Sequence, residues 1–186
     1  GLFLDHRVTR QMVREESAGK NVLNLFAYTG SFSVYAAAGG AQQVVTVDLS
    51  KTYLQWAEKN YALNGFPVAD SKTTTGGIFL HADVKQYLAT IPPASFDLII
   101  MDPPTFSNSK RMDDFLDIQK DHVQLINQCM AALKPGGILY FSTNSRKFEL
   151  NEKEIKAASV KDITKMTTPF DFEGRLYRWC YKIVNR

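Results

Sequence analysis

Short apolar runs rich in Val, Ile and Leu alternate with segments of helical periodicity along most of this chain, and no other feature restricts the fold as strongly. The predicted strands are 21–30, 43–50, 78–84, 96–104 and 138–144. The predicted helices are 31–39, 51–65 and 113–137. Strands of this composition that alternate with helices predict a mainly parallel sheet with helices on both faces.

The last third of the chain departs from this alternation. We predict a short helix at 151–159 and two further strands at 162–167 and 177–184. No helix-length segment separates these two strands, so we expect them to pair antiparallel at one edge of the sheet. The predicted fold class is therefore α/β, a doubly wound, mainly parallel seven-stranded sheet with an antiparallel last strand, and with loops at 65–77 and 105–112.

The bulk composition limits the class of protein. The chain has 186 residues, 45% hydrophobic and 22% charged, as expected for one globular domain spanning 1–186. It contains no run of about 20 apolar residues and no signal-peptide pattern. Cys129 and Cys180 fit reduced thiols of a cytoplasmic protein, and with the histidines they show no metal-ligand spacing. We expect no membrane and no metal partner. Because residue 1 is glycine, we also expect other domains in a longer parent chain.

The formal net charge of +3 is unevenly distributed. Residues 146–186 hold ten Lys or Arg and six Asp or Glu, which leaves a net charge of −1 for residues 1–145. The basic segment also contains interleaved aromatic residues, namely Phe170, Phe172, Tyr177 and Trp179. Such a pattern is compatible with a nucleic-acid partner, although an ordinary solvated surface accounts for it equally well.

Acidic residues and a glycine turn fall at the carboxyl ends of the predicted strands, where open α/β sheets bind ligands. Gly30, in "FAYTGSF" (26–32), allows a sharp turn into a helix whose N-terminal N–H groups face an anion. Asp48 is placed to accept hydrogen bonds from ribose hydroxyls, and Asp83 from an adenine amino group. Each residue alone has an ordinary reading as a turn or a helix cap. Their joint position, with Asp102 at the next strand end, favours a nucleotide site.

The same turn restricts the kind of nucleotide. It has one glycine where a dinucleotide fingerprint needs three, and the chain has no phosphate-binding G-x-x-x-x-G-K-[ST] motif. A nucleoside that carries a small carboxylate and an amine remains, which describes S-adenosylmethionine.

The stretch "DPPTF" (102–106) follows an apolar strand and predicts the reacting side of the site. Pro103 and Pro104 form a rigid extended turn without N–H groups, so their carbonyls and the Asp102 side chain are acceptors for a substrate's amino hydrogens. Phe106 can stack on a planar base, which contributes roughly 1–3 kcal/mol. These four are the predicted catalytic residues. The alternative is a proline-rich turn that caps a helix.

The order of "NLFAYTG", two strand-end aspartates and "DPP" resembles class I S-adenosylmethionine-dependent methyltransferases over the whole chain, and implies their Rossmann-like methyltransferase sheet. "GLFLDHRVTR" and "DPPTFSNSKRM" resemble more closely the C-terminal RlmK half of the bifunctional bacterial 23S ribosomal RNA methyltransferases (RlmKL), a sister group of the RlmI-type 5-methylcytosine enzymes. The cofactor-binding residues that this implies are Asp5, Arg7, Phe26, Ala27, Tyr28, Thr29, Gly30, Asp48, Leu49, Ser50, Asp83, Val84 and Asp102.

The absence of a cysteine after the fifth predicted strand limits which atom can be methylated. Cytosine carbon-5 methylation needs an activated cysteine, which the sister group carries just after the fifth strand. Here "FSTNS" (141–145) has none, and Cys129 and Cys180 are expected in the core. The resemblance implies instead guanine N7 of 23S ribosomal RNA, an in-plane lone pair that needs no general base, so that catalysis is mostly positioning.

RNA contacts are expected around the mouth of the site. Asn144 and Arg146 are predicted to contact the purine, and Lys110 and Arg111 to hold backbone phosphate. Three alternatives remain: methylation of the guanine 2-amino group, which suits the acceptors of "DPP" better than N7; methylation of a protein glutamine amide; or a catalytically silent RNA-binding domain.

Overall fold

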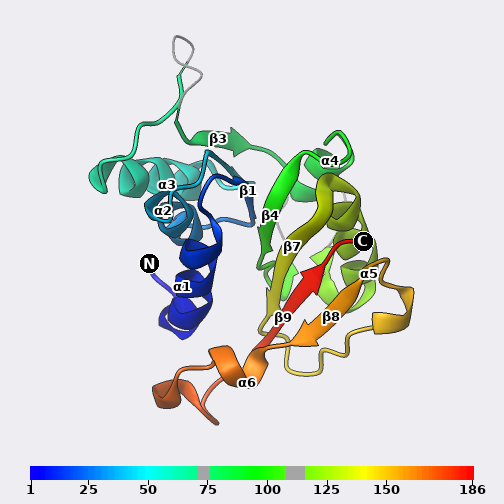
Figure 1. Ribbon diagram of the computed structural model, residues 1–186. Helices are drawn as coiled ribbons and strands as arrows, with labels where there is room; N and C mark the ends of the chain where they lie inside the picture. The colour runs from blue at the N-terminus through cyan, green and yellow to red at the C-terminus, as the bar shows by residue number, and fades with distance from the viewer. Residues whose placement is uncertain (71–75, 108–115) are drawn as a thin grey trace.

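The computed structural model describes residues 1–70, 76–107 and 116–186, and its centre is a seven-stranded sheet of order β3-β2-β1-β4-β7-β9-β8 (Figure 1). Its strands are β1 (Asn21–Leu25), β2 (Gln43–Asp48), β3 (Ile78–His81), β4 (Phe96–Met101), β7 (Leu133–Thr143), β8 (Ser159–Asp162) and β9 (Trp179–Val184). The strands from β3 to β7 run parallel, whereas β9 pairs antiparallel with both β7 and β8. The predicted fold class is confirmed.

Helices cover both faces of the sheet, as expected from strands that are apolar on both sides. In Figure 1, α1 (Arg7–Glu16), α2 (Ser31–Ala38) and α3 (Lys51–Leu63) lie on one face, and α4 (Val84–Leu88) and α5 (Ile118–Ala132) on the other. Two hydrophobic clusters fill the layers between sheet and helices, with Val22 in one and its neighbour Leu23 in the other. None of the helices in the described parts of the chain is long and apolar enough to span a membrane.

The longest predicted helix, 113–137, is confirmed over the shorter range of α5, Ile118–Ala132. The residues predicted as its apolar stripe are all buried: Ile118, Leu125, Ile126, Cys129, Met130 and, directly after the helix, Leu133. Cys129 and Cys180 are both buried free thiols, as predicted. The predicted loop 105–112 contains the short strand β5 (Phe106–Ser107). It pairs with β6 (Leu116–Asp117), which lies in the segment predicted as the start of the long helix.

The expected helix at 151–159 is wrong apart from the single 3₁₀ turn η2 (Glu152–Glu154). The side chain of Asn127 on α5 hydrogen-bonds the carbonyl of Glu154 and the N–H of Lys156, at 2.9 and 2.8 Å, so these backbone groups are paired outside a helix. The strand expected at 162–167 is also misplaced. Strand β8 ends at Asp162, whose carboxylate accepts a bond from the N–H of Thr164 at 2.8 Å. That bond starts the turn of α6 (Thr164–Thr167).

Helix α1, the 3₁₀ turn η1 (Leu4–His6) before it and helix α4 were not predicted from the sequence. The buried residues of α1 are Thr9, Arg10 and Val13, so its inner face does not read as an apolar stripe. Helix α4 is too short to show a periodicity. A further 3₁₀ turn, η3 (Phe170–Phe172), lies between α6 and β9.

Candidate functional site

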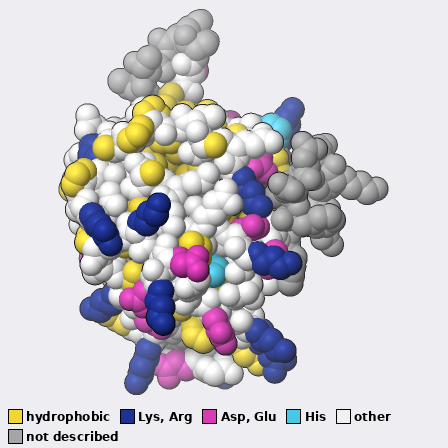
Figure 2. All heavy atoms as spheres, turned by 90° about the vertical axis from the view of Figure 1, so that its right-hand side faces the viewer, with side chains coloured by type: hydrophobic (Ala, Val, Ile, Leu, Met, Phe, Trp, Pro, Cys, Tyr) yellow, Lys and Arg dark blue, Asp and Glu magenta, His cyan; other side chains and the backbone are white. Residues whose placement is uncertain are grey.

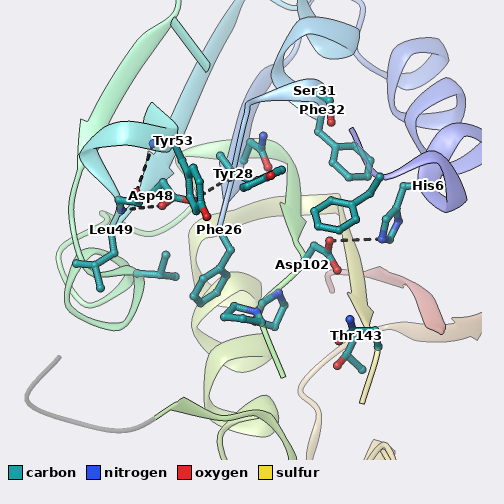
Figure 3. A pocket seen from close by; sticks show the side chains of 18 of the residues that line it. His6, Phe26, Tyr28, Ser31, Phe32, Asp48, Leu49, Tyr53, Asp102 and Thr143 are labelled. Atoms are coloured by element: carbon teal, nitrogen blue, oxygen red, sulfur yellow. Dashed lines mark hydrogen bonds and ion pairs between the residues drawn. The ribbon is translucent and has the colours of Figure 1, made fainter. Parts of the chain in front are cut away.

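The carboxyl ends of the parallel strands open into a cavity of about 670 Å³, within the usual size of small-molecule sites. The predicted residues that line it are Asp5, Phe26, Ala27, Tyr28, Asp48, Leu49, Ser50, Asp83, Val84, Asp102, Pro103, Pro104 and Asn144. Figure 3 shows Asp48, Leu49 and Tyr53 on one side and His6 and Asp102 on the other, with Tyr28 between them. The structure thus gathers the strand-end acids around one space.

Other predicted residues lie outside the cavity lining. Arg7 donates to the carboxylate of Asp171 at 3.1 Å, and neither residue lines the cavity. Thr29 is buried and donates from its hydroxyl to the carbonyl of Gly1 at 2.7 Å. Gly30 shapes the turn without lining the cavity, and Arg146 is exposed. The predictions for Lys110, Arg111 and the side chain of Phe106 lie outside the described part of the chain.

The turn from β1 to α2 has an unusual backbone. Phe26 and Tyr28 have φ values of 53° and 51°, in the left-handed region that side chains rarely adopt. Gly30 follows at 73° and is the N-cap of α2. A Cβ atom at Gly30 would lie 2.7 Å from Cβ of Ala57, so only glycine fits between this turn and α3. Such backbone strain is typical of functional loops.

Asp48 ends β2 with its carboxylate between two backbone donors. The N–H groups of Tyr28 and Ser50 each donate to one carboxylate oxygen, both at 2.8 Å. Burial raises the pKa of Asp48, and these two bonds and nearby His81 act in the opposite direction. Each oxygen keeps a second lone pair. Asp48 can therefore accept further hydrogen bonds from ligand hydroxyls in the cavity.

Asp83 and Asp102 follow the next two strands. Asp83 accepts a bond from the N–H of Gln86 at 3.1 Å and caps α4, so it is a helix cap and a cavity residue at once. Asp102 accepts a 2.6 Å bond from the hydroxyl of Ser142 on β7. This bond sets the direction of the Asp102 carboxylate at the start of the Pro103–Pro104 turn.

Sequence reasoning missed several cavity residues, among them His6, Arg10 and Arg178. Arg10 is 2% exposed and donates to the carbonyl of Phe3 at 2.6 Å, while its Nε has no hydrogen-bond partner among the described residues. His6 and Arg10 are four positions apart, the spacing of one helical face, and this was the available signal. Arg178 gave no signal, since it precedes a strand far along the chain. Nowhere in the described ranges do three or more His, Cys, Asp or Glu side chains form a metal-binding group.

Comparisons with known proteins agree with this geometry. The family model described as S-adenosylmethionine-dependent methyltransferase matches residues 1–175. Ribosomal RNA large subunit methyltransferase K of Neisseria meningitidis is 52% identical over 188 residues, covering 100% of this chain and 51% of that protein. The K/L enzyme of Pseudomonas fluorescens is 48% identical over 188 residues, covering 100% of this chain and 24% of that protein.

A solved methyltransferase in complex with SAH has the same fold, with a TM-score of 0.76 and 28% identity over 98% of this chain and 50% of that one. The chain therefore spans about half of the first of these relatives and about a quarter of the second.

Proposed function

Because this chain belongs to the family of S-adenosylmethionine-dependent methyltransferases, we propose that it methylates a guanine at N7 in 23S ribosomal RNA, as one domain of a longer cytoplasmic protein. The observation that carries the proposal is the placement of Asp48, Asp83 and Asp102 around one cavity at the carboxyl edge of the sheet. The relatives named as large-subunit ribosomal RNA methyltransferases support the choice of RNA.

The cofactor S-adenosylmethionine supplies an electrophilic methyl group on a cationic sulfur. The residues of this cavity fit it. Asp48 has free lone pairs for the ribose hydroxyls, and Asp83 for an adenine amino group. The unpartnered Nε of Arg10 and the first N–H groups of α2, which no side chain caps, suit the methionine carboxylate. Phe26, Leu49 and Val84 supply apolar wall for the adenine.

The target base is expected at the other end of the cavity. Asp102 and the carbonyls of Pro103 and Pro104 are acceptors there, and Thr105 donates its hydroxyl to the side-chain oxygen of Asn144. These groups hold the base edge, while the in-plane lone pair of N7 faces the methyl group. No general base is needed for N7, because it loses no proton. Positioning of the two reactants then supplies most of the rate.

A covalent route through cysteine has no support in the described residues. Cys129 and Cys180 are fully buried, and burial raises the pKa of both thiols. A nucleophilic cysteine needs an accessible thiolate with a lowered pKa. This favours a nitrogen over cytosine carbon-5 as the methylated atom.

We place the RNA strand at the rim near Asn144. Arg146 is exposed, and its guanidinium lies 4.9 Å from the ring centre of Tyr177, which is 54% exposed. A base can stack on such a cation–aromatic pair. On the face that Figure 2 shows, Lys and Arg side chains lie interspersed with Asp and Glu.

The experiment that tests this function is mass spectrometry of nucleosides from naked 23S ribosomal RNA, after treatment with the chain and methyl-labelled cofactor. We expect labelled 7-methylguanosine. Labelled N2-methylguanosine would instead support the second candidate, which the acceptors at Asp102 and its prolines favour. Transfer to a ribosomal protein, or cofactor binding without any transfer to RNA, would contradict the proposal.

Cofactor binding can be tested separately by titration calorimetry. We expect Asp48→Ala to weaken S-adenosylmethionine binding by about 1.5–3 kcal/mol, the contribution of hydrogen bonds to a charged group. Asp97 is the matched control, because its carboxylate accepts from Asn21 and Lys134 and does not line the cavity. Asp97→Ala should bind as the wild type does. Equal affinity of wild type and Asp48→Ala would refute the ribose assignment.

A further inference from the structure

His6 lies at the reacting end of the cavity and faces Asp102 (Figure 3). His6 is 6% exposed, and its ring lies edge-on to the ring of Phe32, with 5.7 Å between the ring centres. Nε2 is 3.4 Å from an oxygen of Asp102 and 3.5 Å from an oxygen of Asp5. These distances are longer than an ordinary hydrogen bond, and such contacts often tighten when ligands bind. One imidazole nitrogen therefore faces both carboxylates.

The other ring nitrogen faces a guanidinium. NH2 of Arg178 lies 3.5 Å from Nδ1 of His6. Arginine is always charged and only donates hydrogen bonds, so Nδ1 must be the acceptor. The proton of the neutral ring is then on Nε2, where it points at Asp102 and Asp5. Arg178 thus selects the tautomer that can donate to the carboxylates.

Arg178 is itself held in one orientation. It is 6% exposed, and it donates to the hydroxyls of Thr9 on α1 and Thr167 on α6 at 2.7 and 2.8 Å. Its Nε has no hydrogen-bond partner among the described residues and lies 3.7 Å from a carboxylate oxygen of Asp5, within the range of an ion pair. The arginine therefore connects both helices to the cavity wall.

We propose that His6 and Arg178 are positioning residues for methyl transfer. Arg178 fixes the tautomer of His6, and His6, together with the Ser142 hydroxyl on the other oxygen, fixes the direction in which the Asp102 carboxylate faces the target base. The inference rests on the proposed function, and it adds two residues to which nothing in the "DPP" motif points. It also explains why a histidine is buried here in a reaction that needs no proton transfer.

The contact itself is tested without activity, by ¹⁵N NMR of the histidine rings. The chain has three histidines, and His6→Gln assigns the signals of residue 6 by their loss. We expect the Nε2–H tautomer in the wild type and a mixture of tautomers in Arg178→Met. Arg175→Met, an exposed arginine of the same segment, is the control and should leave the tautomer unchanged. An Nδ1–H tautomer in the wild type, or no change in Arg178→Met, would overturn the proposal.

The positioning role is tested by single-turnover methylation of 23S ribosomal RNA with saturating cofactor. His6→Gln keeps an N–H donor and should retain most of the rate, whereas His6→Leu should lose on the order of 100-fold, as expected for a misplaced reacting group. The two variants should bind S-adenosylmethionine with similar affinity. A wild-type rate in His6→Leu, or equal losses in both variants, would overturn the positioning role. A wild type that binds cofactor but methylates no RNA would instead count against the proposed function, and the NMR result would stand apart from it.

Discussion

Single residues of this site are held in states that the isolated chain would disfavour. Asp48 is half-buried as a carboxylate, and Phe26 and Tyr28 have left-handed backbones. These features have one common result, because the left-handed turn points the N–H of Tyr28 at Asp48 and satisfies one of its oxygens. At the residue scale, the strained backbone of this turn therefore helps to hold the Asp48 carboxylate in the cavity wall.

The burial of Asp48 predicts a pH dependence of stability. Burial raises the pKa of Asp48 above the value of about 3.9 that an unfolded aspartate has. Asp48 therefore stabilises the fold fully below the unfolded pKa, and this contribution is lost as the pH rises through the folded pKa. We expect the unfolding free energy of the wild type, relative to Asp48→Asn, to fall over that window and to level off above it. Urea unfolding at a series of pH values measures this, and a difference that grows with pH would contradict it.

We expect the addition of one methyl group at Gly30 to lower the unfolding free energy strongly. Gly30→Ala should destabilise the fold by the cost of a left-handed alanine, about 1–2 kcal/mol, and by a further 1–3 kcal/mol for its contact with Ala57. Gly136 has nearly the same φ, 74° against 73°, but nothing lies within 4 Å of its Cβ position. Gly136→Ala should therefore show the backbone cost alone. Urea unfolding of both variants gives the comparison, and equal losses would exclude the steric contribution.

At the scale of elements, the segment η1–α1 supplies side chains to both ends of the cavity. It brings His6 and Arg10 to the cavity from a part of the chain that belongs to no strand–helix unit. It is fastened at its far end by Glu16, whose carboxylate accepts from the hydroxyl of Tyr140 at 2.9 Å and from Nζ of Lys182 at 2.5 Å. Burial raises the pKa of Tyr140, and the neighbouring Glu16 carboxylate raises it further.

This attachment predicts different costs for two adjacent glutamates. Glu16→Ala leaves Tyr140 and Lys182 without their acceptor, and we expect a loss of about 1–3 kcal/mol of unfolding free energy. Glu15 is exposed and bonds only Gln11 among the described residues, so Glu15→Ala should stay within about 0.5 kcal/mol of the wild type. Urea unfolding of the two variants checks this. A Glu16→Ala variant as stable as Glu15→Ala would show that α1 is held by its apolar contacts alone.

At the scale of the whole molecule, the site results from strands that share one direction. Strands β1, β2, β3 and β4 are parallel, so their carboxyl ends meet at one edge and the residues that follow them share one cavity. The antiparallel β9 enters between β7 and β8 and begins at the same edge, which brings Arg178 to the cavity. The two faces of the sheet are packed separately, and the cavity opens at the edge between them.

The sequence by itself determined the layers, the mainly parallel sheet and the position of Asp48, Asp83 and Asp102 along one edge. It could do so because these properties depend on periodicity and on the ends of strands, both of which are local. The same local signals failed at 151–167. There, backbone groups are paired by Asn127 on α5 and by the edge of β9, and neither is near in sequence.

Only the tertiary structure decided which side chains face one another inside the cavity. His6 and Arg178 are separated by 172 positions and meet because β9 is inserted next to β7 with α1 packed against it. Arg10 is buried on the inner face of α1. Because this buried residue is charged, the inner face does not show the apolar periodicity by which a helix is predicted. Such contacts depend on strand order and on how the helices pack on the sheet. Neither can be predicted from the spacing of residues within a short segment.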